Sequence, residues 1–223
     1  MVARFVEALG VRAVDRGAGS CTHRTAGCAG CYVRRQLRQY HDTRACFAAG
    51  GKDDREWSDL SPSYFAGLTP QRFRLCTRGE PFSTLSDVCR IASWTEAAPG
   101  VIFWIPTRGW RDPQIKAAVE RELLPRRNVR ILASVDRETA GETDRLLASG
   151  WSVMYFDPDN RKPETTGRVV KCRKTWNHGA GITCATCRGG CFASGSPRVV
   201  WLRFHGSHGD AEAIRRAADR AAS

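Results

Sequence analysis

The sequence predicts a parallel α/β fold, a partial (βα) barrel of the TIM type, with a cysteine-rich, cluster-binding segment near its carboxyl end. Short, β-branched apolar runs alternate with longer stretches of helical spacing, which is typical of βα units. The runs are largely apolar throughout, as expected for strands covered on both faces. Seven of the ten cysteines fall into two groups of metal-ligand size. At 223 residues and 42% apolar, the chain is long enough to bury a substantial core.

Five strands are predicted from the apolar runs, and a sixth from a shorter run. They cover residues 72–77, 101–107, 129–135, 151–156 and 199–204, with the shorter run at 11–14. Right-handed crossovers between successive strands would curl the sheet toward a barrel.

Helical spacing of apolar residues predicts the elements between and after the strands. These helices cover residues 82–94, 113–124, 138–149 and 210–222, and residues 32–40 are helical in pattern too. Ser83 and Asp112 are expected N-caps, and Gly150 is an expected helix stop. Residues 50–56 begin with two glycines and are expected to form a flexible loop. We divide the chain into a barrel part, 1–165, and a cysteine-rich part with the last strand and helix, 166–223.

Composition narrows the class of protein and its partners. Lysine and arginine number 35 against 23 acidic residues, and the net charge of +12 favours an anionic small-molecule substrate or nucleic acid. No run approaches about 18 apolar residues, and Glu7 interrupts the apolar N-terminal stretch, so we expect neither a membrane span nor a secretory signal. We therefore expect a cytoplasmic protein, in which clustered cysteines are more often metal ligands than disulfides.

The first cysteine group is Cys21, Cys28 and Cys31, directly after the first predicted strand. In parallel α/β folds, reactive groups collect at the carboxyl ends of strands, where loops converge. Three thiolates can hold three irons of a 4Fe-4S cluster and leave the fourth iron open for chemistry. Zinc would need a fourth ligand, so the residues leave both metals open. The candidates for that ligand are His23, His41 and Cys46.

A turn that reads Thr77-Arg78-Gly79-Glu80-Pro81 follows the next strand. A cysteine triplet ending in Cys-x-x-Cys-Tyr, together with this Gly-Glu-Pro turn, resembles the radical S-adenosylmethionine (SAM) superfamily. The more specific resemblance is to small phage and actinobacterial iron-sulfur proteins of the gene product 88 family, which pair a widened triplet with a late cysteine cluster. The strand ends at Thr107-Arg108-Gly109-Trp110 and Ser134-Val135-Asp136 are similar to that group too, and the likeness covers about residues 10–192.

The resemblance implies a radical SAM-like enzyme with two 4Fe-4S clusters and SAM as cofactors. The triplet would hold the reactive cluster, SAM would bind its open iron and be cleaved reductively, and Gly79 and Glu80 would meet the SAM amino group. An external electron donor such as flavodoxin or ferredoxin would be required. The chain departs from the superfamily pattern at two places: six residues separate Cys21 from Cys28 where three are usual, and Arg78 replaces the first glycine of the turn.

The second cysteine group has the spacing C-x11-C-x2-C-x3-C and would hold an auxiliary centre. Its members are Cys172, Cys184, Cys187 and Cys191. Four thiolates suit a 4Fe-4S cluster or a structural zinc equally, and the resemblance favours iron-sulfur. Residues 161–203 hold nine basic side chains and one acidic one. This charge either offsets a cluster or forms a nucleic-acid footprint, with Trp176 and Trp201 as candidate stacking residues.

Arg108 and Asp136 are the candidate catalytic residues, because each follows an apolar strand at its carboxyl end. An arginine there can clamp a carboxylate, and an aspartate can hold a ribose hydroxyl or transfer a proton. We expect Glu80 and Arg108 to be exposed in the barrel mouth, and Cys76 and Cys89 to be small core side chains. Two other functions remain open: an iron-sulfur enzyme that uses the open iron without SAM, and a zinc-stabilised nucleic-acid-binding protein.

Overall fold

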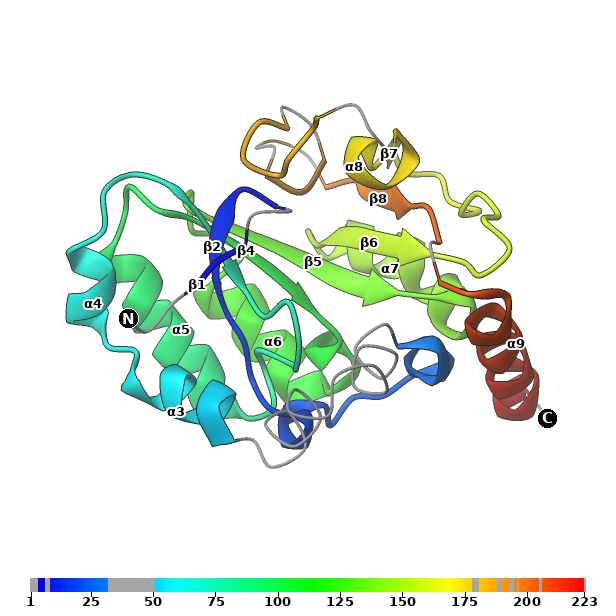
Figure 1. The fold of residues 1–223 in the computed structure, drawn as a ribbon, viewed down its shortest axis with the longest axis horizontal. Helices are drawn as coiled ribbons and strands as arrows, with labels where there is room; N and C mark the ends of the chain where they lie inside the picture. The colour runs from blue at the N-terminus through cyan, green and yellow to red at the C-terminus, as the bar shows by residue number, and fades with distance from the viewer. Residues whose placement is uncertain are drawn as a thin grey trace.

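A computed structural model of the chain describes residues 4–6, 9–31, 51–177, 181–187, 190–192, 195, 197–204 and 206–222. Its centre is an eight-stranded sheet with the strand order β1-β2-β3-β4-β5-β6-β8-β7 (Figure 1). Strand β1 is antiparallel to β2, whereas the other seven strands run parallel to one another. The predicted α/β class is confirmed, and the parallel sheet is compatible with a partial barrel.

The strands follow the predicted apolar runs closely. Their bounds are β1 Arg4–Val6, β2 Val11–Val14, β3 Arg72–Leu75, β4 Ile102–Thr107, β5 Val129–Val135, β6 Ser152–Phe156, β7 Val169–Lys171 and β8 Val199–Leu202. Strand β3 ends two residues earlier than predicted, because the backbone of Cys76 turns to a φ of 61°. Strands β1 and β7 were not predicted, since three residues are too few to establish an alternation pattern.

The described residues contain seven α-helices and five short 3-10 turns, which lie between the strands except for the last helix, which follows β8. The α-helices are α3 Gly51–Asp59, α4 Pro62–Ala66, α5 Leu85–Ala97, α6 Pro113–Glu122, α7 Thr143–Ala148, α8 Arg173–Trp176 and α9 His208–Ala222. The 3-10 turns are η1 Ala18–Ser20, η2 Ala26–Gly30, η3 Gly109–Arg111, η4 Arg137–Glu142 and η5 Gly190–Phe192. The helix predicted over 138–149 is thus divided between η4 and α7, and the one predicted over 32–40 lies outside the described residues.

The helix starts show which capping predictions were right. Asp112 is the N-cap of α6, and its carboxylate accepts hydrogen bonds from the backbone N–H groups of Gln114 and Ile115. The prediction of Ser83 as the N-cap of α5 was wrong. Thr84 caps that helix, because its hydroxyl and the Asp87 carboxylate form a reciprocal capping box.

The prediction of a flexible loop at residues 50–56 was also wrong, because the chain from Gly51 to Asp59 forms helix α3. Its helical state follows from packing. Trp57 is 2% exposed, and its ring meets that of Trp94 edge-on at a centroid distance of 5.1 Å. Burying an indole of this size stabilises the helix more than Gly51 and the charged residues disfavour it.

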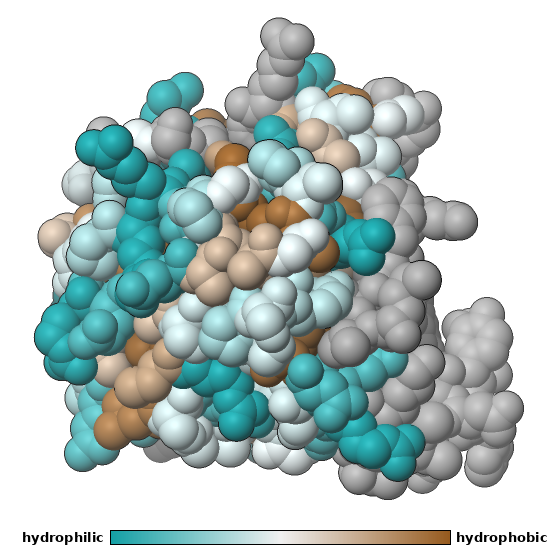
Figure 2. Space-filling model, turned by 90° about the vertical axis from the view of Figure 1, so that its left-hand side faces the viewer, coloured by the Kyte–Doolittle hydropathy of each residue, from teal (hydrophilic) through white to brown (hydrophobic). Residues whose placement is uncertain are grey.

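The main core lies between the sheet and helices α5, α6 and α7, which cover one of its faces (Figure 1). Alternate residues of each strand enter this core, so Phe73 and Leu75 of β3 are fully buried there. The opposite face carries a smaller apolar cluster that includes Trp104, Leu132 and Phe192. The outer surface near α3 and α4 mixes hydrophilic and hydrophobic residues (Figure 2).

The carboxyl-terminal part of the chain belongs to the same sheet. Strands β8 and β7, from the predicted segment 166–223, extend it beyond β6. Cys76 is buried as expected, but Cys89 is exposed on α5, because it lies on the side of that helix away from the sheet. Among the described residues, no helix is long and apolar enough to cross a membrane.

Candidate functional site

The cysteine triplet lies where the sequence places it, after the carboxyl end of β2. From there the chain passes through η1 and η2 and crosses toward α9 (Figure 1). Helix α9 packs on η2 so closely that a Cβ added at Gly30 would lie 2.6 Å from Ile214 Cδ1 and 2.7 Å from the Asp210 carbonyl oxygen. The C-terminal helix therefore fixes the segment between Cys28 and Cys31.

Cys28 and Cys31 lie close enough to Cys21 to affect the ionisation of its thiol. Burial, together with the negative charges of Glu80, Cys28 and Cys31, raises the pKa of Cys21 to about 11. Within the described residues, no three histidine, cysteine or acidic side chains converge tightly enough to hold a metal ion as the chain stands. The donor set itself, three thiols on one loop, suits an iron-sulfur cluster with an open iron. Metal loading would have to draw the sulfurs together and displace the Cys21 proton.

Four side chains that follow the carboxyl ends of β4 and β5 hold the loop that precedes Cys28. We call residues 24–27 the anchored segment. Asp136 Oδ2 accepts hydrogen bonds from the Gly27 N–H at 3.0 Å and from the Thr25 hydroxyl. The Glu138 carboxylate accepts from the Ala26 N–H, and Arg111 donates to the Arg24 carbonyl oxygen. The fourth side chain is that of Arg108, whose Nε donates to the Thr25 hydroxyl at 3.0 Å.

Asp136 is completely buried and directed at the anchored segment. A Cβ at Gly27 would lie 2.3 Å from Asp136 Oδ2, so only glycine allows this approach. The structure thus brings Asp136 to the triplet, as predicted, with both carboxylate oxygens already engaged: Oδ1 accepts from the Thr139 hydroxyl at 3.2 Å. These contacts make Asp136 a positioning residue for the cysteine loop.

The Arg108 side chain places a positive charge next to Asp136 in this site. Its Nη2 lies 3.6 Å from Asp136 Oδ2, and 22% of its side chain is exposed. Burial alone would lower the pKa of this guanidinium, but the negative charges of Cys28 and Asp136 outweigh burial and raise it. Arg108 thus places a positive charge beside Cys28.

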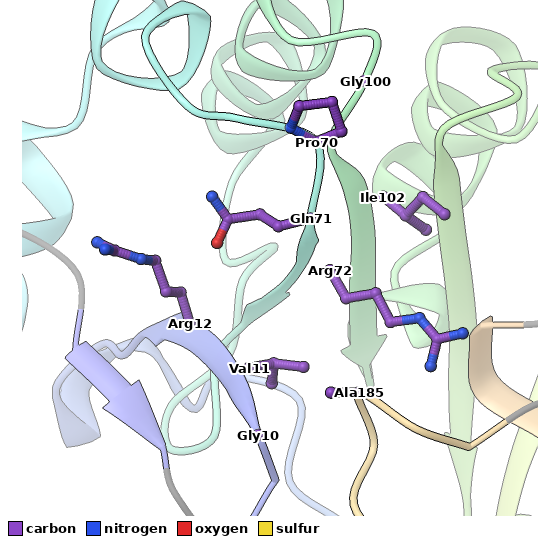
Figure 3. A pocket seen from close by; sticks show the side chains of 9 residues that line it. All are labelled: Gly10, Val11, Arg12, Pro70, Gln71, Arg72, Gly100, Ile102 and Ala185. Carbon is purple, nitrogen blue, oxygen red and sulfur yellow. The ribbon is translucent and has the colours of Figure 1, made fainter.

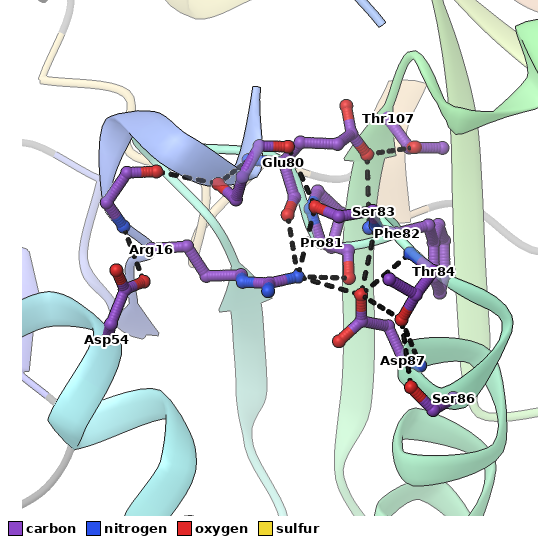
Figure 4. Close-up of polar contacts among 12 residues, drawn as sticks. Arg16, Asp54, Glu80, Pro81, Phe82, Ser83, Thr84, Ser86, Asp87 and Thr107 are labelled. Carbon is purple, nitrogen blue, oxygen red and sulfur yellow. Dashed lines mark hydrogen bonds and ion pairs between the residues drawn. The ribbon is translucent and has the colours of Figure 1, made fainter. Parts of the chain in front are cut away.

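Glu80 is buried, at 7% exposure, so the expectation that it is exposed was wrong. Its carboxylate accepts hydrogen bonds from the Thr107 hydroxyl and from the Phe82 N–H at 3.2 Å (Figure 4). It also accepts one from the Arg108 N–H at 2.8 Å. Burial raises the pKa of Glu80, and these hydrogen bonds oppose that rise. Glu80 therefore connects the turn to the end of β4 instead of facing solvent.

The turn that contains Gly79 also supports the cysteine loop. The backbone N–H of Glu80 donates to Ser20 Oγ at 2.9 Å, one residue before Cys21. Arg16 donates to the carbonyl oxygens of Glu80 and Pro81 and forms an ion pair with Asp87 at 3.0 Å (Figure 4). Gly79 has a φ of +79°, and a Cβ there would lie 2.5 Å from the Arg16 carbonyl oxygen. Glycine is required at this position because of that close approach.

Comparison with known proteins returns no match. No protein-family model, no curated protein and no solved structure is significantly similar to the chain. The chemistry of the site therefore rests on its own residues.

The late cysteines lie on the other face of the sheet, where Cys172, Cys184 and Cys191 pack against the apolar cluster around Trp104. Cys184 and Cys187 lie at the amino-terminal start of β3, whereas Cys172 directly follows the carboxyl end of β7. Burial and the negative charges of Cys172 and Cys187, opposed by the charge of Arg74, raise the pKa of Cys184 to about 11. The late thiols thus gather at a place separate from the triplet. Cys46 and His41 lie outside the described residues.

The two tryptophans proposed for base stacking are packed against each other. The Trp176 and Trp201 rings meet at a centroid distance of 4.5 Å, and Trp176 Nε1 donates to the Trp201 carbonyl oxygen. Lys171 Nζ lies 4.8 Å from the centroid of Trp176. This arrangement favours a packing role for both rings over base stacking.

Two cavities lie at the amino-terminal edge of the sheet, away from the triplet. One, of about 670 Å³, is bounded by the starts of β2, β3 and β4 and by Ala185 of the late cysteine loop (Figure 3). The other, of about 390 Å³, includes Arg126, Arg127, Arg130 and Cys191 in its lining. We assign the triplet, and not either cavity, as the candidate active site, because the reactive side chains gather there.

Sequence reasoning missed several residues of the site. Glu138 follows the end of β5 by three positions, and the strand-end argument that selected Asp136 applies to it as well. Thr25, Ser20 and Arg16 gave no such signal, because their partners lie 60 or more residues away in the chain.

Proposed function

We propose that the chain is a radical SAM-like iron-sulfur enzyme whose reactive cluster is held by Cys21, Cys28 and Cys31. The observation that carries the proposal is the placement of three thiols at the carboxyl end of a parallel sheet, on a loop held by Asp136 and Glu138. A 4Fe-4S cluster with three protein thiolates would supply an open iron for electron transfer or substrate binding. The late cysteines would hold a second, closed cluster.

The chain's own residues would prepare the triplet for this task. Asp136 and Glu138 fix the backbone that leads to Cys28, which lowers the ordering cost when the sulfurs converge. Arg108 places a positive charge beside Cys28 and is partly exposed, so one edge of its guanidinium is available to an anionic substrate. A small anionic substrate, a flavodoxin-like or ferredoxin-like electron donor and a cytoplasmic location belong to the same proposal.

SAM fits this site less well than the cluster does. The resemblance implies that Glu80 contacts SAM, which requires an oxygen of Glu80 that is free to accept a hydrogen bond. The carboxylate of Glu80 already accepts three hydrogen bonds, and Arg16 donates to its carbonyl oxygen. This burial favours a second candidate, an iron-sulfur enzyme that uses the open iron directly without SAM. We derive no role for Glu80 toward SAM.

Anaerobic reconstitution with iron and sulfide tests the proposal. About eight irons and eight sulfides per chain would match two clusters, whereas stoichiometric zinc without sulfide would refute it. Replacing Cys21, Cys28 and Cys31 with alanine should halve the iron content and abolish turnover, and replacing Cys184 and Cys187 should halve the iron content separately. Cys89→Ala is the matched control, because this exposed thiol belongs to neither group.

Incubation of the reduced enzyme with SAM then separates the two candidates. Release of 5′-deoxyadenosine that depends on the triplet supports the radical SAM reaction. A SAM-independent spectrum with an intact cluster supports direct chemistry at the open iron instead. Glu80→Gln, which removes the charge but keeps the side-chain shape, should leave any SAM affinity unchanged if the buried carboxylate has no contact with SAM.

A further inference from the structure

The late cysteine loop, residues 181–187 and 190–192, is attached to the amino-terminal edge of the sheet. The Ala185 N–H donates to the Leu9 carbonyl oxygen at 3.1 Å, just before β2. A Cβ at Gly10 would lie 2.9 Å from Thr183 Oγ1, so the loop approaches the backbone of that edge closely. The loop thus rests on strand starts that come more than 100 residues earlier in the chain.

One side chain of the sheet reaches three points of this loop. Arg72, the first residue of β3, donates from Nη1 to the carbonyl oxygen of Cys187 at 2.8 Å and to that of Cys184. Its guanidinium carbon also lies 4.8 Å from the ring centroid of Phe192, the neighbour of Cys191. A single arginine therefore contacts two cysteines of the group directly and the residue beside a third.

We propose that Arg72 is the positioning residue that shapes the late cysteine group before any metal binds. The inference rests on the proposed function in one respect, that these cysteines are metal ligands. Hydrogen bonds from a charged donor are stronger than those between neutral groups, and both of these lock the backbone at ligand positions. Arg72 also places its planar guanidinium over the Phe192 ring, and lysine lacks this rigid, planar group.

The neighbouring contacts support this role. Phe192 meets Trp104 of β4 edge-on at 5.2 Å, and Arg74, two residues after Arg72 on the same face of β3, lies 4.3 Å from the Trp104 centroid. The loop carries few backbone bonds of its own in its described part, among them the one from Cys187 N–H to the Thr183 carbonyl oxygen at 2.9 Å. Thr183 and Thr186 exchange side-chain hydrogen bonds within the loop, and Arg72 of β3 attaches the loop to the sheet.

The test compares the full-length chain with Arg72→Gln and Arg72→Lys, and with Arg12→Gln as the matched control. Arg12 lines the same cavity from β2, but its guanidinium is directed away from Ala185 (Figure 3). The first measurement needs no metal: hydrogen exchange of the amides of residues 183–187 in the reduced chain. Both Arg72 variants should exchange at least tenfold faster there while the β5 amides are unchanged, and the control should match the parent chain. Equal exchange in all chains would overturn the proposal.

The second measurement uses Co²⁺, whose absorption reports tetrahedral thiolate coordination, in chains with serine at Cys21, Cys28 and Cys31. Both Arg72 variants should bind Co²⁺ at least tenfold more weakly than the parent, with lysine giving no rescue, while Arg12→Gln stays within twofold. Equal Co²⁺ affinity in all chains would refute a positioning role toward the ligands. If the parent gives no thiolate spectrum, the late metal site of the proposed function fails, and the exchange measurement still decides whether Arg72 orders the loop.

Discussion

Replacing Asp136 with asparagine is the most direct perturbation of the cysteine loop, because the change keeps the side-chain shape and removes its charge. Asp136 is completely buried and accepts from Thr25 and Gly27, and it is paired with Arg108 at 3.6 Å. Removing one partner of a buried ion pair typically costs about 3–5 kcal/mol. Since the Arg108 side chain is 22% exposed and water can partly screen it, we expect the lower end, about 3 kcal/mol.

Thermal unfolding of the reduced, metal-free chain measures this loss. For a chain of this length, about 3 kcal/mol corresponds to a fall in Tm of roughly 6–12 °C. Glu96→Gln is the control, because Glu96 is 76% exposed and pairs with Arg126 at 3.6 Å on the surface, where we expect a loss below about 1 kcal/mol.

A second measurement connects the stability loss to the site. After reconstitution, Asp136→Asn should lose iron from the triplet cluster while the late cluster stays loaded, because the anchored segment leads directly to Cys28. An Asp136→Asn variant that melts no lower than the Glu96 control, or that loads the triplet as fully as the parent chain, would refute the positioning role.

Two further changes test other parts of the structure. Gly79→Ala should lower the free energy of unfolding by about 1–3 kcal/mol, because it combines a φ of +79° with a Cβ 2.5 Å from the Arg16 carbonyl oxygen. Gly19→Ala, with nothing within 4 Å of the added Cβ, should change urea stability far less, and equal losses would contradict the argument. Burial raises the pKa of Tyr155 to about 12, above its unfolded value of about 10. Its contribution to stability is therefore present below about pH 10 and is lost as the pH rises toward 12. Tyr155→Phe should remove this alkaline loss in urea titrations, and an unchanged pH profile would exclude Tyr155 as its source.

The sequence alone determined six of the eight strands and the position of the triplet. Runs such as Val129–Val135 are largely apolar, as expected for a strand covered on both faces, so β5 was predicted with its observed bounds. Parallel strands bring their carboxyl ends to one edge, which is why Cys21, Arg108 and Asp136 were expected together. Helix α6 was equally predictable, because the cap at Asp112 is a local interaction.

Only the tertiary structure decided the state of α3, the burial of Glu80 and the place of the late cysteines. Residues 51–59 form a helix because Trp57 packs against Trp94, a partner that lies 37 positions along the chain. Glu80 is buried because Thr107 and the Arg108 backbone supply its hydrogen bonds from the next strand. The late loop lies at the amino-terminal edge because Arg72 binds carbonyl oxygens more than 100 residues away. Contacts at such separations depend on how the strands are ordered in space, and no local spacing in the sequence carries that information.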